Sequence, residues 1–232
     1  LSTQRRLTAA GSTTSEATNN SAGSNDVASV NTAEVQRKNV AVAVVNLSGT
    51  HELPPSQLEK RLATATGIVC KAASNNRGIV DYFHGDHFVV TFGASKPASQ
   101  PDVKAALFCH AVHVALSAEG LAAAAGVACG KATVGYFGDT SMKRFGSVGT
   151  CFTAAMLMAR ECRRLQRKYK GGGESQQAVH TVVRGLHLEN LATRFELDVV
   201  GLLDETVENS LGGAQRVSMV SLGAAHDHED DE

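Results

Sequence analysis

The sequence predicts an α+β fold, in which helices pack over a mixed but mainly antiparallel sheet. The expected order of elements is β-α-β-β-α-β-β-α-β-α-β-β, and such folds alternate hairpins with helical crossovers. The clearest local signal is residues 79–93, where β-branched and aromatic runs flank the dipeptide Gly85-Asp86 and predict a hairpin. A third observation is a strand-like segment, residues 121–137, that carries regularly spaced glycines.

The composition limits what this chain can be. It has 232 residues, of which 43% are hydrophobic and 19% charged, with a net charge of −1. The length suits one sizeable domain with tails, and the charge balance argues against a nucleic-acid binder that relies on a basic field. We find neither an apolar run long enough to span a bilayer nor a signal peptide. Because the first residue is Leu1 rather than Met, we expect a fragment of a longer protein, and membrane segments could lie outside this fragment.

The cysteines indicate a reducing compartment. They are odd in number and show no C-x-x-C spacing, and most lie in apolar stretches, which predicts packed thiols, a cytoplasmic setting and no zinc site. The five are Cys70, Cys109, Cys129, Cys151 and Cys162.

The two ends differ from the middle. Residues 1–36 are rich in Ser, Thr, Asn, Ala and Gly and predict a disordered linker. Residues 37–223 form the predicted domain. Residues 224–232 are acidic and include two histidines, which we interpret as a solvated, disordered tail rather than a metal site.

The first half of the domain begins with a nearly continuous apolar run at residues 40–47, typical of a strand buried on both faces. Pro54-Pro55 then opens a helix to about residue 73. In the hairpin that follows, the Gly85-Asp86 turn could hold a carboxylate within reach of a ligand, or could be an ordinary polar tip.

The second half begins with a helix at residues 101–118, whose His110 and His113 we interpret as surface or half-buried residues. The glycine-bearing strand, residues 121–137, predicts a close approach by another backbone or a ligand. A short strand at 144–148 and a helix at 149–169 follow. The domain closes with strands at 179–183, 195–202 and 215–222 and a short helix at 185–193.

The helix at 149–169 ends in a basic run. A solvated helix end favoured by the helix dipole is our interpretation, and phosphate contact is the alternative. The run consists of Arg160, Arg163, Arg164, Arg167, Lys168 and Lys170.

Four motifs occur in a fixed order along residues 39–222. They are Asn46-Leu47-Ser48-Gly49, then Gly85-Asp86-x-Phe88-x-x-x-Phe92-Gly93, the glycine pattern of residues 126–138, and Val148-Gly149 before a helix. In these motifs, and in the closing Arg194-Phe195-Glu196-Leu197, the chain resembles the catalytic domain of class III adenylate and guanylate cyclases. The resemblance implies a fold with a ferredoxin-like βαββαβ core.

The resemblance also implies a chemistry. Family cyclases bind a nucleoside triphosphate between two such domains, and two carboxylates hold two divalent ions, Mg²⁺ or Mn²⁺. A Lys and an Asp contact the base, and an Asn and an Arg one helical turn apart position the ribose and stabilise the transferring phosphate.

Only one of these six family positions keeps its residue here. The metal positions fall on Asn46, which is neutral, and Asp86, which is kept. Gly49 and Thr50 follow Asn46 and could offer backbone N–H groups to a phosphate. The remaining family positions fall on Tyr82 and Arg144 for the base, Thr153 for the ribose and Leu157 for the catalytic arginine.

The sequence therefore predicts a degenerate cyclase-homology domain without catalytic residues of its own. We expect it to dimerise or to act as a regulatory or scaffolding module in a larger, cytoplasmic or membrane-bound, signalling protein. The alternative is one subunit of an active heterodimer that makes cyclic nucleotide from ATP or GTP. The expected partner is another cyclase-homology domain or a different protein, and Mg²⁺ or Mn²⁺ is expected only together with a nucleotide.

Overall fold

The computed structural model describes residues 35–139, 141–169, 180–184, 188–206 and 214–225, within one compact unit, Ala33–Glu232. The order of elements is the one that the sequence predicts. The elements are β1 (Gln36–Leu47), α1 (Pro55–Asn75), β2 (Ile79–His84), β3 (His87–Phe92), α2 (Pro101–Ala118), β4 (Ala123–Gly138), β5 (Lys143–Val148), α3 (Thr150–Tyr169), β6 (Thr181–Arg184), α4 (Leu188–Ala192), β7 (Phe195–Thr206) and β8 (Ala214–Ala225).

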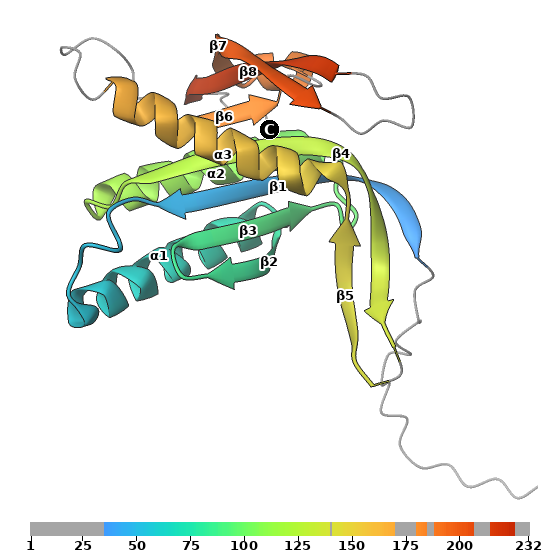
Figure 1. Cartoon of the computed structure of the whole chain (residues 1–232), viewed down its shortest axis with the longest axis horizontal. Coiled ribbons are helices and arrows are strands. Elements are labelled where there is room, and N and C mark those ends of the chain that lie inside the picture. Colours follow the sequence, from blue (N-terminus) through green and yellow to red (C-terminus); the bar gives the residue numbers. More distant parts are fainter. Residues whose placement is uncertain (1–34, 140, 170–179, 185–187, 207–213, 226–232) are drawn as a thin grey trace, which may run out of the picture. The chain divides into compact units, whose positions relative to one another are not determined.

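The strands form one sheet in the order β2-β3-β1-β4-β6-β8-β7, and β5 pairs with β4 beside this path. The pairing of β4 with β6 is parallel, whereas the other pairings between described strands are antiparallel. In Figure 1, α3 crosses one face of this sheet and α1 and α2 lie behind the other. The predicted α+β class, with a mixed and mainly antiparallel sheet, is confirmed.

The predicted hairpin forms from β2 and β3. Gly85 and Asp86 make the turn between the paired residues His84 and His87, and Gly85 has a positive φ of 59°. The tip lies at the end of β1, because the backbone N–H of Leu47 donates to the carbonyl oxygen of Asp86 at 2.9 Å. The two metal positions of the sequence comparison are therefore neighbours, as expected.

Alternate residues of β1 serve the two faces of the sheet, as the period of a strand requires. Ala41, Ala43, Val45 and Leu47 belong to a core shared with α1 and α2. Val40, Val42 and Val44 belong to a second core shared with α3. By the same alternation, Asn46 is on the α3 face.

Gly126 explains how α3 sits on β4. A Cβ atom at this position would lie 2.1 Å from the backbone nitrogen of Ala159 and 2.4 Å from the carbonyl oxygen of Ala155. No side chain fits in so short a gap, so the helix backbone rests directly on the strand. The close approach predicted from the strand glycines is confirmed here.

The cysteines are free thiols, as expected, but they are not all packed. Cys109, Cys151 and Cys162 are buried and Cys129 is half-buried, whereas Cys70 is exposed on α1. Most of the predicted linker (1–36) and tail (224–232) lies outside the described residues, but Gln36 already belongs to β1, and residues 224–225 belong to the end of β8. No helix in the described ranges is both long and apolar enough to cross a membrane.

Candidate functional site

One group of candidate residues gathers where β1 ends. The Thr50 hydroxyl donates a hydrogen bond to Oδ2 of Asp86 at 3.2 Å, and Nδ1 of His87 contacts Oδ1 of the same carboxylate. Thr50 is only 7% exposed, so the loop after β1 is fixed against the hairpin tip. Both carboxylate oxygens of Asp86 therefore already have a protein partner.

These contacts set the charge state of Asp86. Partial burial alone would raise the pKa of the carboxyl group, but the hydrogen bonds from His87 and Thr50 and the charge of His87 outweigh it. The net effect lowers the pKa of Asp86 below its usual value. Asp86 thus remains an anion at neutral pH.

Asn46 occupies the other metal position. It pairs with His87 on one side and Ala124 on the other, and it is 7% exposed. Its Oδ1 is buried and has no hydrogen-bond partner among the described residues. A buried acceptor of this kind usually has a partner, which marks the position as one that a ligand could complete.

The loop after Asn46 has the shape of an anion cradle. Gly49 has a φ of +70°, a conformation that favours glycine. The backbone N–H groups of Gly49 and Thr50 donate to no backbone carbonyl within the described ranges. Successive free N–H groups beside a left-handed residue are a common phosphate-binding arrangement.

The base-reading positions form a second group on β2 and β5. Tyr82 is 48% exposed and its ring stacks on His84, with centroids 6.2 Å apart. Arg144 lies next to it, since its Nη2 donates to the carbonyl oxygen of Asp81 at 3.1 Å. Burial raises the pKa of Asp81, and the charge of Arg144 opposes that rise. The two positions expected to contact the base are therefore close together, but they carry an aromatic ring and a cation instead of a lysine and an aspartate.

The last two positions lie on α3 and differ in surroundings. Thr153 is exposed. Leu157 is half-buried and packs against a cluster beneath α3. That cluster consists of Ala124, Met158, Cys162, Leu165, Val182 and Met219. Position 157 therefore contributes to packing, and its side chain has no donor for a phosphate.

Arg163 is a site residue that the sequence did not single out. Its Nη2 donates to the carbonyl oxygen of Leu47 at 2.6 Å, from a half-buried position on α3. The interpretation of the basic run as a solvated helix end holds for the exposed Arg160, Arg164 and Arg167, but it is wrong for Arg163. In the sequence, Arg163 differs from the other basic residues of the run only in its position along the helix.

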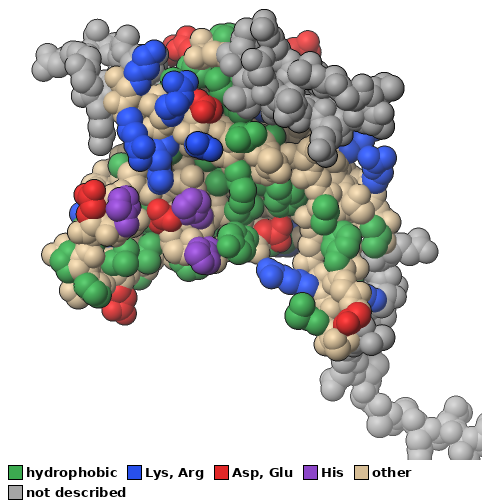
Figure 2. Space-filling model, viewed as in Figure 1, with side chains coloured by type: hydrophobic (Ala, Val, Ile, Leu, Met, Phe, Trp, Pro, Cys, Tyr) green, Lys and Arg blue, Asp and Glu red, His purple; other side chains and the backbone are tan. Residues whose placement is uncertain are grey.

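Figure 2 shows the α3 face as a surface. Lys and Arg side chains gather over the C-terminal half of α3, next to a group of His and acidic side chains. Hydrophobic side chains lie between α3 and the β4–β5 hairpin. This face therefore carries both the polar candidate residues and an apolar area.

The residues at the end of β1 do not fit a pair of divalent ions. Asn46 contributes no negative charge, and both oxygens of Asp86 already contact protein groups. The positive guanidinium of Arg163 is bound to the carbonyl oxygen of Leu47, the residue after Asn46. Divalent ions of this kind need several oxygen ligands and anionic charge. In the described part of the chain, no group of three His, Cys, Asp or Glu residues could hold a metal ion.

Solved structures with the same fold are nucleotide cyclase domains. The guanylyl cyclase Cya2 aligns with a TM-score of 0.62 and 18% identity over 84% of this chain and 97% of its own. The adenylyl cyclase CyaB from P. aeruginosa aligns with a TM-score of 0.66 and 18% identity, over 84% and 98%. The guanylate cyclase domain of RhGC from Catenaria anguillulae, solved with GTP, aligns at 0.62 and 14%, over 82% and 100%. No protein-family model and no curated protein matches the sequence.

Proposed function

We propose that this chain, which has the fold of adenylyl and guanylyl cyclase catalytic domains, makes no cyclic nucleotide by itself and serves as a dimerisation or regulatory module. The observation that carries this proposal is Leu157, which packs under α3 where the resemblance implies an arginine. Removing one donor to a developing oxyanion costs about a hundredfold or more in rate. Here the metal carboxylate at position 46 is replaced as well.

The α3 face supports a protein partner. Tyr82, which pairs with Val89 of the core beneath α3, is 48% exposed, and Met156 on α3 is 50% exposed. Exposed apolar groups that gather on one face are typical of interaction surfaces, and Figure 2 shows hydrophobic side chains on this face. The guanylyl cyclase domain of RhoGC from Blastocladiella emersonii is described as a dimer in one structure and a monomer in another. We infer that the partner here is a second cyclase-homology domain and that the pair works in the reducing cytoplasm, a setting that the free thiols support.

A second candidate function is one subunit of an active heterodimer. It is favoured by the preserved Asp86, which Thr50 and His87 orient, and by the free N–H groups of the Gly49 loop. In that case the partner would supply the arginine, the ribose contact and the second metal carboxylate, and ATP or GTP with Mg²⁺ or Mn²⁺ would bind between the chains.

A cyclase assay separates the two. The 232-residue chain, incubated with ATP or GTP and Mg²⁺ or Mn²⁺, is expected to give no cyclic nucleotide above a protein-free blank. The double variant Asn46→Asp, Leu157→Arg should also make no cyclic nucleotide, because the groups of a catalytic site act as a unit. Turnover by the unmodified chain alone contradicts the proposal. Turnover that requires a second cyclase domain supports the heterodimer.

Self-association is measured separately by sedimentation. Met156→Asp should weaken a dimer that uses the α3 face. Val199→Asp is the matched control, since Val199 is 72% exposed on β7, at the opposite edge of the sheet from β2. A dimer that loses stability with the control variant, and not with Met156→Asp, places the interface elsewhere.

A further inference from the structure

The guanidinium of Arg163 lies over the end of β1. Its Nη2 donates to the Leu47 carbonyl at 2.6 Å, across 116 residues of sequence. On the next turn of α3, Gln166 donates from Nε2 to the carbonyl of Ala123, at the start of β4, at 2.9 Å. Two side chains of α3 therefore bind the ends of neighbouring strands, which fixes where the Arg163 charge sits.

Two buried polar atoms at this place have no hydrogen-bond partner in the described part of the chain. Asn46, on the α3 face, has an unpaired Oδ1, and Arg163 has an unpaired Nε. Asn46 and Leu47, the residue that holds Arg163, are consecutive in β1. One atom is an acceptor and the other a donor, and leaving either buried and unpaired is costly.

The two atoms together select the kind of ligand. A divalent cation would coordinate the oxygen of Asn46, but it cannot accept from Arg163 Nε and would be repelled by the guanidinium. A phosphate oxygen accepts from Arg163, and a P–OH or sugar hydroxyl can both accept and donate. A ligand with acceptor oxygens and a hydroxyl can therefore satisfy both atoms.

The rest of the site agrees with an anion. The N–H groups of Gly49 and Thr50 are available in the adjoining loop. The Asp86 carboxylate opposes an anion, but its two oxygens are turned to Thr50 and His87. Its pKa is lowered, so this opposing charge is present at neutral pH.

We infer that Arg163 takes the place of a metal ion at the end of β1. The group formed by Asn46, Arg163 and the loop at Gly49 and Thr50 then binds a phosphate-bearing anion without a divalent cation. The inference rests on the proposed function, because a working cyclase would need metal ions at the same place. It also assigns a role: the domain would respond to a polyphosphate or nucleotide by binding it rather than by converting it.

The test measures binding, so that it stays separate from the cyclase assay. Inorganic triphosphate is titrated into the 232-residue chain by calorimetry, once with EDTA and once with Mg²⁺. Binding is expected in EDTA, and Mg²⁺ should not strengthen it, because the cation competes for the probe. Absence of binding in EDTA, or binding only with Mg²⁺, overturns the inference and leaves the proposed lack of turnover untouched.

Arg163→Gln should weaken triphosphate binding by about tenfold to a hundredfold, the usual worth of a charged hydrogen bond. Arg164→Gln is the matched control. It removes the same charge from the next residue, whose guanidinium is committed to Glu161 at 2.6 Å and is 59% exposed. An equal loss in both variants would show a diffuse charge effect and would overturn the specific role of Arg163.

Asp86→Asn is the most decisive variant, because the two models predict opposite changes in the affinity for triphosphate. This test does not depend on whether Arg163→Gln folds stably. If the anion binds without metal, removing this opposing charge should tighten triphosphate binding several-fold. If the site works through a bound cation, the same change should weaken binding. A loss of affinity in Asp86→Asn therefore contradicts the inference.

Discussion

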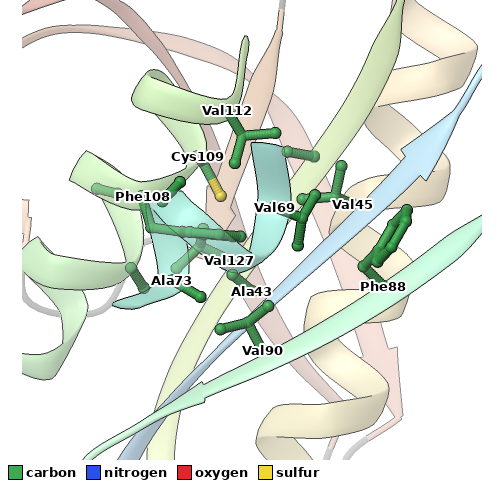
Figure 3. Packing of buried hydrophobic residues seen from close by; sticks show 14 of the residues in the cluster. Ala43, Val45, Val69, Ala73, Phe88, Val90, Phe108, Cys109, Val112 and Val127 are labelled. Carbon is green, nitrogen blue, oxygen red and sulfur yellow. The ribbon is translucent and has the colours of Figure 1, made fainter. Parts of the chain in front are cut away.

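The two faces of the sheet are built differently. Behind the sheet, α1 and α2 supply large side chains, and Figure 3 shows Val69, Phe108 and Val112 packed with strand residues such as Val45 and Phe88. On the front, α3 buries small residues against β1 and β4, with its backbone touching β4 at Gly126, and larger ones such as Met158 and Leu165 nearer β6. The first face is closed by ordinary hydrophobic packing, whereas the second depends on close backbone contact.

This difference explains where the candidate site lies. β3 is buried except at His87, but β2 and the loop after β1 keep exposed residues, so the end of β1 remains accessible. Asn46 and the Asp86 turn are at that accessible end, and Arg163 reaches them from the helix. The helix pair serves stability, whereas the α3 face combines stability with the proposed ligand and partner contacts.

The largest effect is expected where α3 rests on β4. Gly126→Ala would place a Cβ atom 2.1 Å from the Ala159 nitrogen, so helix and strand must separate. We expect a loss of about 3 kcal/mol in the free energy of unfolding, measured by urea denaturation.

Gly67→Ala is the control for that experiment, because an added Cβ on this exposed position of α1 meets nothing within 4 Å. It should stabilise the helix by about 0.5–1 kcal/mol. If Gly126→Ala unfolds at the same urea concentration as the unmodified chain, the backbone contact that distinguishes the α3 face is not there.

A smaller effect is expected at Leu157. Because the side chain is half-buried against the cluster beneath α3, Leu157→Ala should lower the free energy of unfolding by about 1–2 kcal/mol, below the range for full burial. Thr153→Ala, exposed one turn earlier on α3, should stay within about 0.5 kcal/mol. Equal values for the two variants would mean that position 157 has no packing role, and would remove the main support for the proposed loss of catalysis.

The sequence predicted most of the face covered by α1 and α2 and only part of the face covered by α3. Strong local signals such as the Pro54-Pro55 helix start and the Gly85-Asp86 turn gave the right elements in the right order. The Asn46 and Asp86 neighbourhood followed from the motif comparison. The insertion of β6 between β4 and β8 was not predicted, because strand order depends on contacts between distant segments.

Arg163 was missed for a related reason. Its contact with Leu47 spans 116 residues, and in the sequence it is one of several basic residues on the same helix. Charge and helical period predict a solvated end for the whole run, since they carry no information on what lies opposite each side chain. His113 is half-buried, as the sequence predicts, but its ring also stacks on His180 next to the start of β6, with centroids 3.3 Å apart, and the sequence does not predict that contact.

The smallest expected effect concerns this histidine pair, which lies between α2 and β6. Burial lowers the pKa of His180 to about 4, with help from the charges of His113 and His110, and burial also lowers the pKa of His113. In the unfolded chain both titrate near 6.5. Between these values the unfolded state binds more protons than the folded state, so stability falls as the pH is lowered from about 6.5 toward about 4.

The pair should therefore make the protein acid-sensitive, by about 1 kcal/mol once the half-exposed rings are discounted for solvent screening. His180→Phe keeps an aromatic ring beside His113 but cannot take up a proton, so urea midpoints measured across this pH range should vary less than in the unmodified chain. His51→Gln is the control, because its side chain is 75% exposed, and it should keep the original pH dependence. If His180→Phe and the unmodified chain lose stability equally on acidification, the histidine pair is not the source of the sensitivity.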